Sequence, residues 1–175
     1  TRLRHIGIVA CSAEGAALCY RTICLEGAPL LGPHAHPEVS MHTHSLADYT
    51  ERIDRGDWDG VGELMLSSAG KLAKAGADFL ICPDNTIHQV LPRIGMRSPL
   101  PWLHIAEVVA AEAVERGFRR IGLTGTRSSS STGSSGSFVG RSHLLMNVKI
   151  GTPRRRQTSN SLRVCGSIPL AASIT

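Results

Sequence analysis

The chain has no long apolar run: no stretch reaches the roughly 18 consecutive apolar residues that a membrane-spanning helix needs. Its first residues lead directly into a short strand-like pattern, without the apolar region and small-residue cleavage site of a secretory signal. The five cysteines are an odd number at irregular spacings, which does not fit a disulfide framework. Without an export signal, reduced thiols are the expected state, and we predict a cytoplasmic protein that does not bind a membrane.

Acidic residues are absent from the last part of the chain. Residues 1–127 hold 13 basic and 14 acidic side chains, whereas residues 128–175 hold six basic ones, no acidic one and 12 serines. The net charge of +5 therefore arises from the last 48 residues. We predict that residues 1–127 form an α/β lobe. Residues 128–175 are predicted to form a poorly ordered Ser/Gly/Arg-rich tail.

Two hydrophobic periodicities alternate along the first 127 residues. Short apolar runs, typical of strands buried on both faces, alternate with stretches that carry one apolar stripe at helical spacing. The predicted strands cover residues 5–10, 38–44, 78–82, 102–105 and 120–124, and the predicted helices cover residues 13–26, 46–54, 61–75, 83–94 and 106–116. This alternation predicts a Rossmann-like α/β fold, a parallel sheet with helices on both faces.

Three polar turns are predicted to lie at one edge of this sheet. Right-handed crossovers place the carboxyl ends of parallel strands along the same edge, where α/β proteins bind their ligands. The turns over residues 11–15, 82–86 and 124–127 each follow a predicted strand. The sequence therefore predicts a functional site at this edge.

Cys82 stands at the end of the third predicted strand, directly before Pro83. Because proline is favoured as the first residue of a helix, the thiol is expected near free backbone N–H groups at a helix N-terminus. Such a position favours a thiolate, unless the carboxylate of Asp84 points at the sulfur. The position is equally compatible with a small buried hydrophobic residue, since free cysteines are often buried.

Four segments carry a more specific pattern. They read I-G-I-V-A-C-S-A-E-G-A-A-L-C-Y, H-P-E-V-S-M-H-T-H, C-P-D-N-T-I-H and G-F-R-R-I-G-L-T-G-T-R. In these segments the chain resembles the aspartate/glutamate racemase family, the cofactor-independent amino-acid racemases and their relatives. The C-P-x-N-T element is the specific one, because that family carries its first catalytic cysteine there. The resemblance implies that Cys82 transfers a proton and that Asn85 and Thr86 hold the substrate α-carboxylate.

The resemblance covers residues 5–127 and implies two further substrate contacts. One is Ser12, in the first turn, which here lacks the family's usual glycine pair and is one residue shorter. The other is Thr126, in the turn that leads into the family's second half. The resemblance also implies that no cofactor takes part and that the protein forms a homodimer.

Racemisation without a cofactor makes a clear chemical demand. Removing the α-proton of an amino acid creates a poorly stabilised carbanion, so the carboxylate must be held by preorganised donors between a base and an acid. In the family that the chain resembles, two cysteines exchange these roles. Cys165, in V-C-G-S-I-P-L, is faintly similar to a C-T-E-I-P-L segment and is the candidate for the second thiol. The alternative is that Cys165 is an incidental cysteine of the tail.

The resemblance implies a pyridoxal-phosphate-independent amino-acid racemase of aspartate/glutamate type, acting on a small amino acid or carboxylate. Two alternatives stay open: a one-cysteine isomerase or decarboxylase of the same superfamily, and a truncated, non-catalytic form that binds a carboxylate. Because the composition changes abruptly inside a family motif, we hypothesise that residues 128–175 come from an altered reading frame of a longer gene. Such a change would impair activity, and sequencing the gene around codon 127 tests it.

Several histidines invite other interpretations. Four of them lie close together in the sequence, but no cysteine or carboxylate completes a zinc set at the usual spacing, so we predict no metal site. These four are His34, His36, His42 and His44. His88 and His104 are instead predicted to lie near Cys82 and to support it.

Nucleotide and nucleic-acid binding are weakly supported. Gly7 and Gly15 are too far apart for a dinucleotide-binding fingerprint, and the turn over residues 124–127 has no Walker lysine. In the basic tail Phe138 is the one aromatic residue, and no recognisable nucleic-acid module surrounds the triplet at residues 154–156. We therefore expect no nucleic-acid partner.

Overall fold

The computed structural model describes residues 2–118, 147–149 and 161–163. The strands are β1 (Ile6–Ala10), β2 (Val39–Thr43), β3 (Phe79–Ile81), β4 (Trp102–Leu103), β5 (Asn147–Lys149) and β6 (Ser161–Arg163). The α-helices are α1 (Ala13–Leu31), α2 (Leu46–Asp54), α3 (Trp58–Lys74), α4 (Leu91–Ile94) and α5 (Ile105–Glu115). Two 3₁₀ helices, η1 (Asn85–Val90) and η2 (Gly95–Arg97), flank α4.

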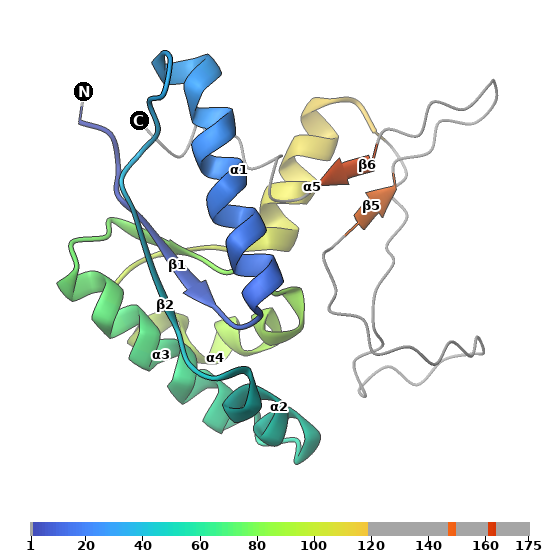
Figure 1. Ribbon diagram of the computed structural model, residues 1–175. Coiled ribbons are helices and arrows are strands. Elements are labelled where there is room, and N and C mark those ends of the chain that lie inside the picture. The colour runs from blue at the N-terminus through green and yellow to red at the C-terminus, as the bar shows by residue number, and fades with distance from the viewer. Residues whose placement is uncertain (1, 119–146, 150–160, 164–175) are drawn as a thin grey trace.

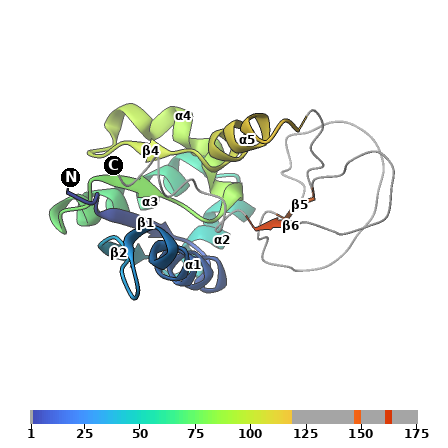
Figure 2. The same cartoon turned by 90° about the horizontal axis from the view of Figure 1, so that it is seen from above.

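The main sheet consists of four parallel strands in the order β2-β1-β3-β4. Figure 1 shows α1 and α5 on one side of these strands and α2, α3 and α4 on the other. In the view from above, β2 and β4 lie at opposite ends of the sheet (Figure 2). The predicted Rossmann-like parallel sheet with helices on both faces is therefore confirmed.

Both faces of the central strands are buried because their side chains are apolar in both directions. Ile6 and Ile8 of β1 pack with Ile23 of α1 in one hydrophobic cluster. Val9, which points to the opposite face, belongs to a second cluster that α3 completes with Met65. Full burial of each aliphatic side chain of this kind stabilises the folded state by about 1.5–3 kcal/mol. The continuous apolar run of β1 is thus explained by helices that cover both faces of the strand.

Helix α3 follows the predicted stripe of apolar residues. Asp57 caps its first turn by accepting the backbone N–H of Gly60 at 2.8 Å. Val61 and Leu72 are buried against the sheet, as their spacing predicts. The helix ends before Gly76, whose φ of 91° lies in the left-handed region that glycine adopts without strain.

Several predicted element boundaries were wrong. Helix α1 continues past residue 26 to Leu31 with Pro29 inside it, and Gly27 packs closely against the backbone of the returning chain at residues 35–36. Residue 105, predicted as the end of a strand, is the first residue of α5. His104 ends β4 early because its Nδ1 accepts the N–H of Ala106 at 3.2 Å and so caps α5.

The fifth predicted strand, over residues 120–124, and the turn after it lie outside the described residues. Within the tail, β5 pairs antiparallel with β6 in a separate two-stranded sheet.

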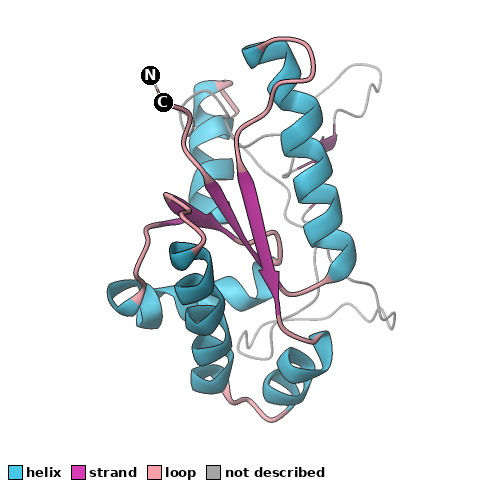
Figure 3. Cartoon of the chain, turned by 60° about the vertical axis from the view of Figure 1, so that its left-hand side comes forward, coloured by secondary structure: helices cyan, strands magenta, loops and turns pink. Residues whose placement is uncertain are grey.

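Figure 3 shows the main sheet enclosed by its helices. Among the described residues, no helix is both long and apolar enough to cross a membrane.

Candidate functional site

The carboxyl ends of β1 and β3 lie side by side at the centre of the sheet. The chain leaves β1 into α1, on one face, and leaves β3 into η1, which contacts α3 on the other face. In open α/β sheets such a divergence creates a crevice at the carboxyl ends of the two strands, where ligands bind. The predicted turns over residues 11–15 and 82–86 meet at this edge of the sheet.

Asp84 joins these two turns. Its Oδ2 accepts the backbone N–H of Cys11 at 3.2 Å and that of Ser12 at 3.1 Å, and its Oδ1 accepts the Ser12 hydroxyl at 2.5 Å. These donors stand at the N-terminus of α1, where the helix dipole favours a negative charge. The Asp84 carboxylate therefore holds the end of β1 against the turn that follows β3.

The bridging role of Asp84 was missed from sequence, where Asp84 was considered only as a charge near the Cys82 sulfur. Strand register is the signal that would have found it. β1 and β3 pair in parallel with Ile8 opposite Ile81, so continuing the register places residue 11 level with residue 84. Using this register requires knowing that β1 and β3 are neighbours in the sheet, and a single sequence does not reveal the strand order.

Cys82, in the turn after β3, is buried, with only 3% of its surface exposed. Its side chain belongs to the same hydrophobic cluster as Val9, Cys11 and Tyr49. The sulfur lies 3.7 Å from the backbone carbonyl oxygen of Asp84, to which a thiol can donate a hydrogen bond. The burial expected for a small hydrophobic residue is therefore present, in a turn that also carries hydrogen-bonding groups.

The predicted α-helix over residues 83–94 was wrong in its first half. Residues 85–90 form the 3₁₀ helix η1, and α-helical geometry begins only at Leu91. Asp84 stays extended, with φ −101° and ψ 102°, because its carboxylate reaches across to the turn after β1. Cys82 therefore does not adjoin the first turn of an α-helix, and the dipole of a long helix cannot favour its thiolate.

The other predicted site residues divide into two groups. Ser12 is buried: it accepts the N–H of Gly15 at 3.2 Å as the cap of α1 and donates to Asp84. Asn85 and Thr86 are partly exposed at the start of η1. Thr126 and Cys165 lie outside the described residues.

The remaining described cysteines differ in their surroundings. Burial first, and then the charge of Asp84, raises the pKa of Cys11 to about 12, so this thiol keeps its proton at neutral pH. Cys19 is buried against Ile23 and the sheet, which confirms the packing role predicted for it. Cys24 is partly exposed on the same helix.

His88 lies beside Cys82, as predicted, but it binds the backbone of Cys82 and not its sulfur. Its Nε2 lies 2.9 Å from the Cys82 carbonyl oxygen and donates to it, since a carbonyl can only accept. The ring packs edge-on against His104, with centroids 4.8 Å apart. Burial, as the largest cause, lowers the pKa of His88 to about 4, so the imidazole is neutral at pH 7.

The pKa of His88 predicts how stability depends on pH. The unfolded side chain has a pKa near 6.5, so the unfolded state binds the extra proton first as the pH falls. The free energy of unfolding should therefore be highest above pH 6.5 and fall by about 2–3 kcal/mol between pH 6.5 and about 4. Urea unfolding at a series of pH values measures this slope.

Two variants isolate the contribution of His88. His88→Gln keeps a donor for the Cys82 carbonyl but does not titrate, and it should flatten the slope between pH 6.5 and about 4. His34→Asn is the control, because His34 is exposed and its φ of 65° is one that asparagine tolerates. An unchanged slope in His88→Gln would show that another group governs the pH dependence.

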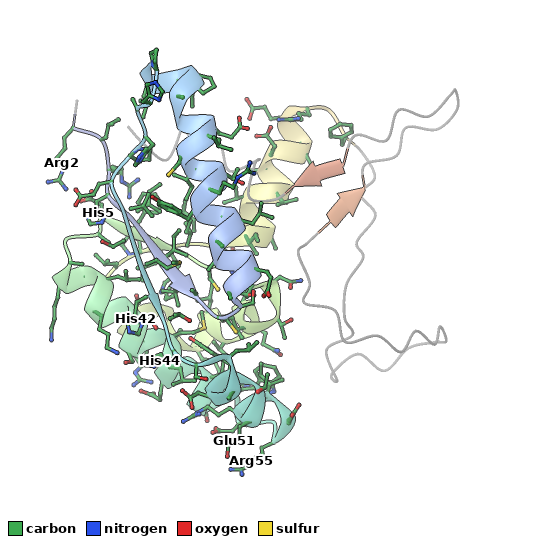
Figure 4. All side chains as sticks on the ribbon, in the orientation of Figure 1. Arg2, His5, His42, His44, Glu51 and Arg55 are labelled. Atoms are coloured by element: carbon green, nitrogen blue, oxygen red, sulfur yellow. The ribbon has the colours of Figure 1, made fainter. Side chains whose placement is uncertain are left out.

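The four neighbouring histidines do not gather into a metal site in the part of the chain that the structure describes. Figure 4 shows His42 and His44 near α3. Lys71 donates to Nε2 of His42 at 3.0 Å, and Nδ1 of His42 lies 2.9 Å from the Ser68 hydroxyl. Because both ring nitrogens of His42 are engaged, this side chain has no electron pair available for a cation.

Comparison with known proteins agrees with the fold. The chain belongs to the Asp/Glu/Hydantoin racemase family, whose model matches residues 8–165. The match extends past residue 127, where the recognisable motifs end, and its last residue is Cys165. The resemblance to aspartate/glutamate racemases is therefore confirmed at the level of the family.

Two solved structures are similar in fold. A Yersinia pestis protein, provisionally assigned as an Asp/Glu racemase, is 26% identical with a TM-score of 0.63; the match covers 66% of this chain and 51% of that one. An aspartate racemase homologue from Pyrococcus horikoshii is 22% identical with a TM-score of 0.62, and the match covers 67% and 51%. The matched part is about half the length of each of these proteins.

Proposed function

We propose that this chain carries one half of a cofactor-independent amino-acid racemase site, with Cys82 as a proton-transferring thiol. The observation that supports it most is that Cys82 lies where the ends of β1 and β3 meet, in a member of the Asp/Glu/Hydantoin racemase family. A thiol suits this role because its pKa lies within a few units of neutral pH. Its protonated form can therefore act as the acid and its ionised form as the base.

The substrate carboxylate is proposed to bind Asn85 and Thr86. Both are partly exposed in the turn after Cys82 and carry neutral donors, which can bind a carboxylate without neutralising its charge. The N–H groups of Cys11 and Ser12 already have an acceptor in Asp84. Ser12 is therefore proposed to act mainly by holding the turn, with Thr126 as an additional substrate contact.

The proposed proton transfer needs two groups on opposite faces of the α-carbon. The Cys82 thiolate removes the α-proton and becomes the thiol, while a second thiol donates its proton from the other face and becomes the thiolate. Cys165 is proposed as that second thiol. Cys11 is a poor substitute, because a pKa of about 12 keeps it from acting as the base in the reverse direction.

Chiral chromatography of single enantiomers tests this proposal. The purified chain is incubated separately with L- and D-aspartate and with L- and D-glutamate, which are the small acidic amino acids that the family description names. We expect each enantiomer of the true substrate to approach an equal mixture. If all four samples keep their enantiomeric purity, the racemase proposal for this chain is wrong.

We also propose, by family analogy, that the chain forms a homodimer. Measuring the molecular mass of the protein in solution tests this.

One-thiol chemistry is the second candidate. The observation that favours it is that, among the described residues, Cys82 and Cys11 are the thiols that directly follow β3 and β1, and the raised pKa of Cys11 keeps it protonated. A one-thiol enzyme would exchange the α-proton in D₂O without inverting the carbon, or would release carbon dioxide. A non-catalytic carboxylate-binding form would bind the amino acid and show neither exchange nor inversion.

A further inference from the structure

Helix α1 is apolar on two sides. Its inner side packs on the sheet through a buried stripe: Gly15, Ala16, Cys19, Ile23 and Gly27. A surface helix normally places charged residues on the opposite side. Of the 19 residues of α1, only Glu14, Arg21 and Glu26 are charged. The outer side of α1 therefore differs from that of a helix that faces only water.

The outer side carries a second stripe, which we call the α1 outer stripe. Its residues are Glu14, Ala17, Leu18, Arg21, Leu25 and Ala28. Residues three, four and seven positions apart lie on one face of a helix. Leu25 keeps 55% of its surface exposed. Figure 2 shows α1 at the margin of the main body, with no other described helix on its far side. The stripe is thus an apolar surface that no described helix covers.

The two charges of the α1 outer stripe form no ion pair with another described residue of the chain. Both side chains are exposed. Glu14 and Arg21 are seven residues apart, which is about 10 Å along the helix axis and too far for an ion pair within α1. Arg55 and Glu51 of α2, by contrast, are four residues apart and do form such a pair. A partner molecule could supply the missing opposite charges.

We propose that the α1 outer stripe is a self-association surface, on which α1 of a second copy packs antiparallel about a two-fold axis. With the axis between Ala17 and Leu18, Glu14 of each copy lies level with Arg21 of the other. The small side chain of Ala17 leaves room for Leu18 of the second copy. A two-fold interface joins the same surface of both copies, so the opposite charges pair twice.

The order of the charges favours a second copy as the occupant. Residues 14 and 21 lie equally far, on opposite sides, from the point between residues 17 and 18. A two-fold axis through that point exchanges them, so each copy supplies the charge that the other needs. A parallel pairing would place like charges level with each other, which is unfavourable. This surface is the proposed interface of the homodimer named above, and it does not depend on the racemase chemistry.

Charge reversal tests the surface by sedimentation velocity of the intact chain at a series of protein concentrations. Arg21→Glu and Glu14→Arg should each raise the dimer dissociation constant by about tenfold or more, because each places like charges together twice. The double variant Glu14→Arg/Arg21→Glu pairs opposite charges again. Its dissociation constant should lie within about threefold of wild type, because the two changes are coupled across the interface.

Glu26→Arg is the matched control, because it reverses an exposed charge of the same helix outside the α1 outer stripe. It should leave the dissociation constant unchanged. Circular dichroism checks that all variants are folded. Arg21→Glu keeps the acidic residue in the first turn of α1, whereas Glu14→Arg loses its favourable interaction with the helix dipole. The pair of single variants therefore separates association from helix stability.

Three results would overturn the surface: a wild-type chain that stays monomeric, single variants that dimerise as tightly as Glu26→Arg, and a double variant that dimerises no more tightly than the single ones. Racemisation is measured on the same samples. Racemisation by a dimer that ignores these substitutions would reject the surface and keep the proposed function. Restored dimerisation in the double variant, without racemisation in any sample, would uphold the surface and reject the proposed function.

Discussion

Replacing Cys82 by serine is expected to lower the racemisation rate by about a thousandfold or more. A serine hydroxyl is a far weaker acid than a thiol, so almost none of it is ionised at neutral pH. The exchanged atom is the sulfur of a buried side chain directly after β3. Chiral chromatography of the reaction with the best substrate measures the rate.

Cys24→Ser is the matched control for this substitution. Cys24 is partly exposed on α1, and its replacement should leave the rate within about twofold of wild type. Circular dichroism should show that both variants are folded before their rates are compared. A Cys82→Ser protein that is folded and as active as Cys24→Ser would remove Cys82 from the mechanism.

Replacing Asp84 by alanine is expected to lower the free energy of unfolding by about 3–4 kcal/mol. The change removes the acceptor of three hydrogen bonds and leaves two backbone N–H groups without a partner. It also removes a negative charge from the N-terminus of α1. Urea denaturation at neutral pH measures the loss, and substrate binding should weaken because the two turns are no longer held together.

Two further variants separate the causes of this loss. Asp84→Asn keeps one acceptor oxygen and should lose about half as much stability as the alanine variant. Asp54→Ala, at the exposed end of α2, should change stability by less than about 0.5 kcal/mol. If Asp84→Ala were as stable as Asp54→Ala, the bridge between the turns would not contribute to folding.

The architecture could be predicted because each element has a recognisable local sequence pattern. The continuous apolar run of β1 and the apolar stripe of α3 both show, from the spacing of apolar residues alone, which side chains are buried. Helix α2 covers the predicted residues 46–54, since Ser45 caps it and its apolar residues face α3. Glycine at positions 76 and 117 marks helix ends through a positive φ that other residues rarely adopt.

The chemistry of the candidate site could be predicted only in part. The position of Cys82 at a strand end was predicted, because strand periodicity and the following proline are local signals. The 3₁₀ geometry of residues 85–90 was not predicted, because it depends on Asp84 reaching a residue more than 70 positions away in the sequence.

The role of Cys82 as proton carrier is tested most directly by the exchange of the substrate α-proton in D₂O, followed by NMR. We expect the wild-type chain and Cys24→Ser to incorporate deuterium at the α-carbon of the same acidic amino acid, with inversion. We expect Cys82→Ser to incorporate none above the uncatalysed rate. Incorporation by Cys82→Ser at the wild-type rate would contradict the claim that this thiol carries the proton.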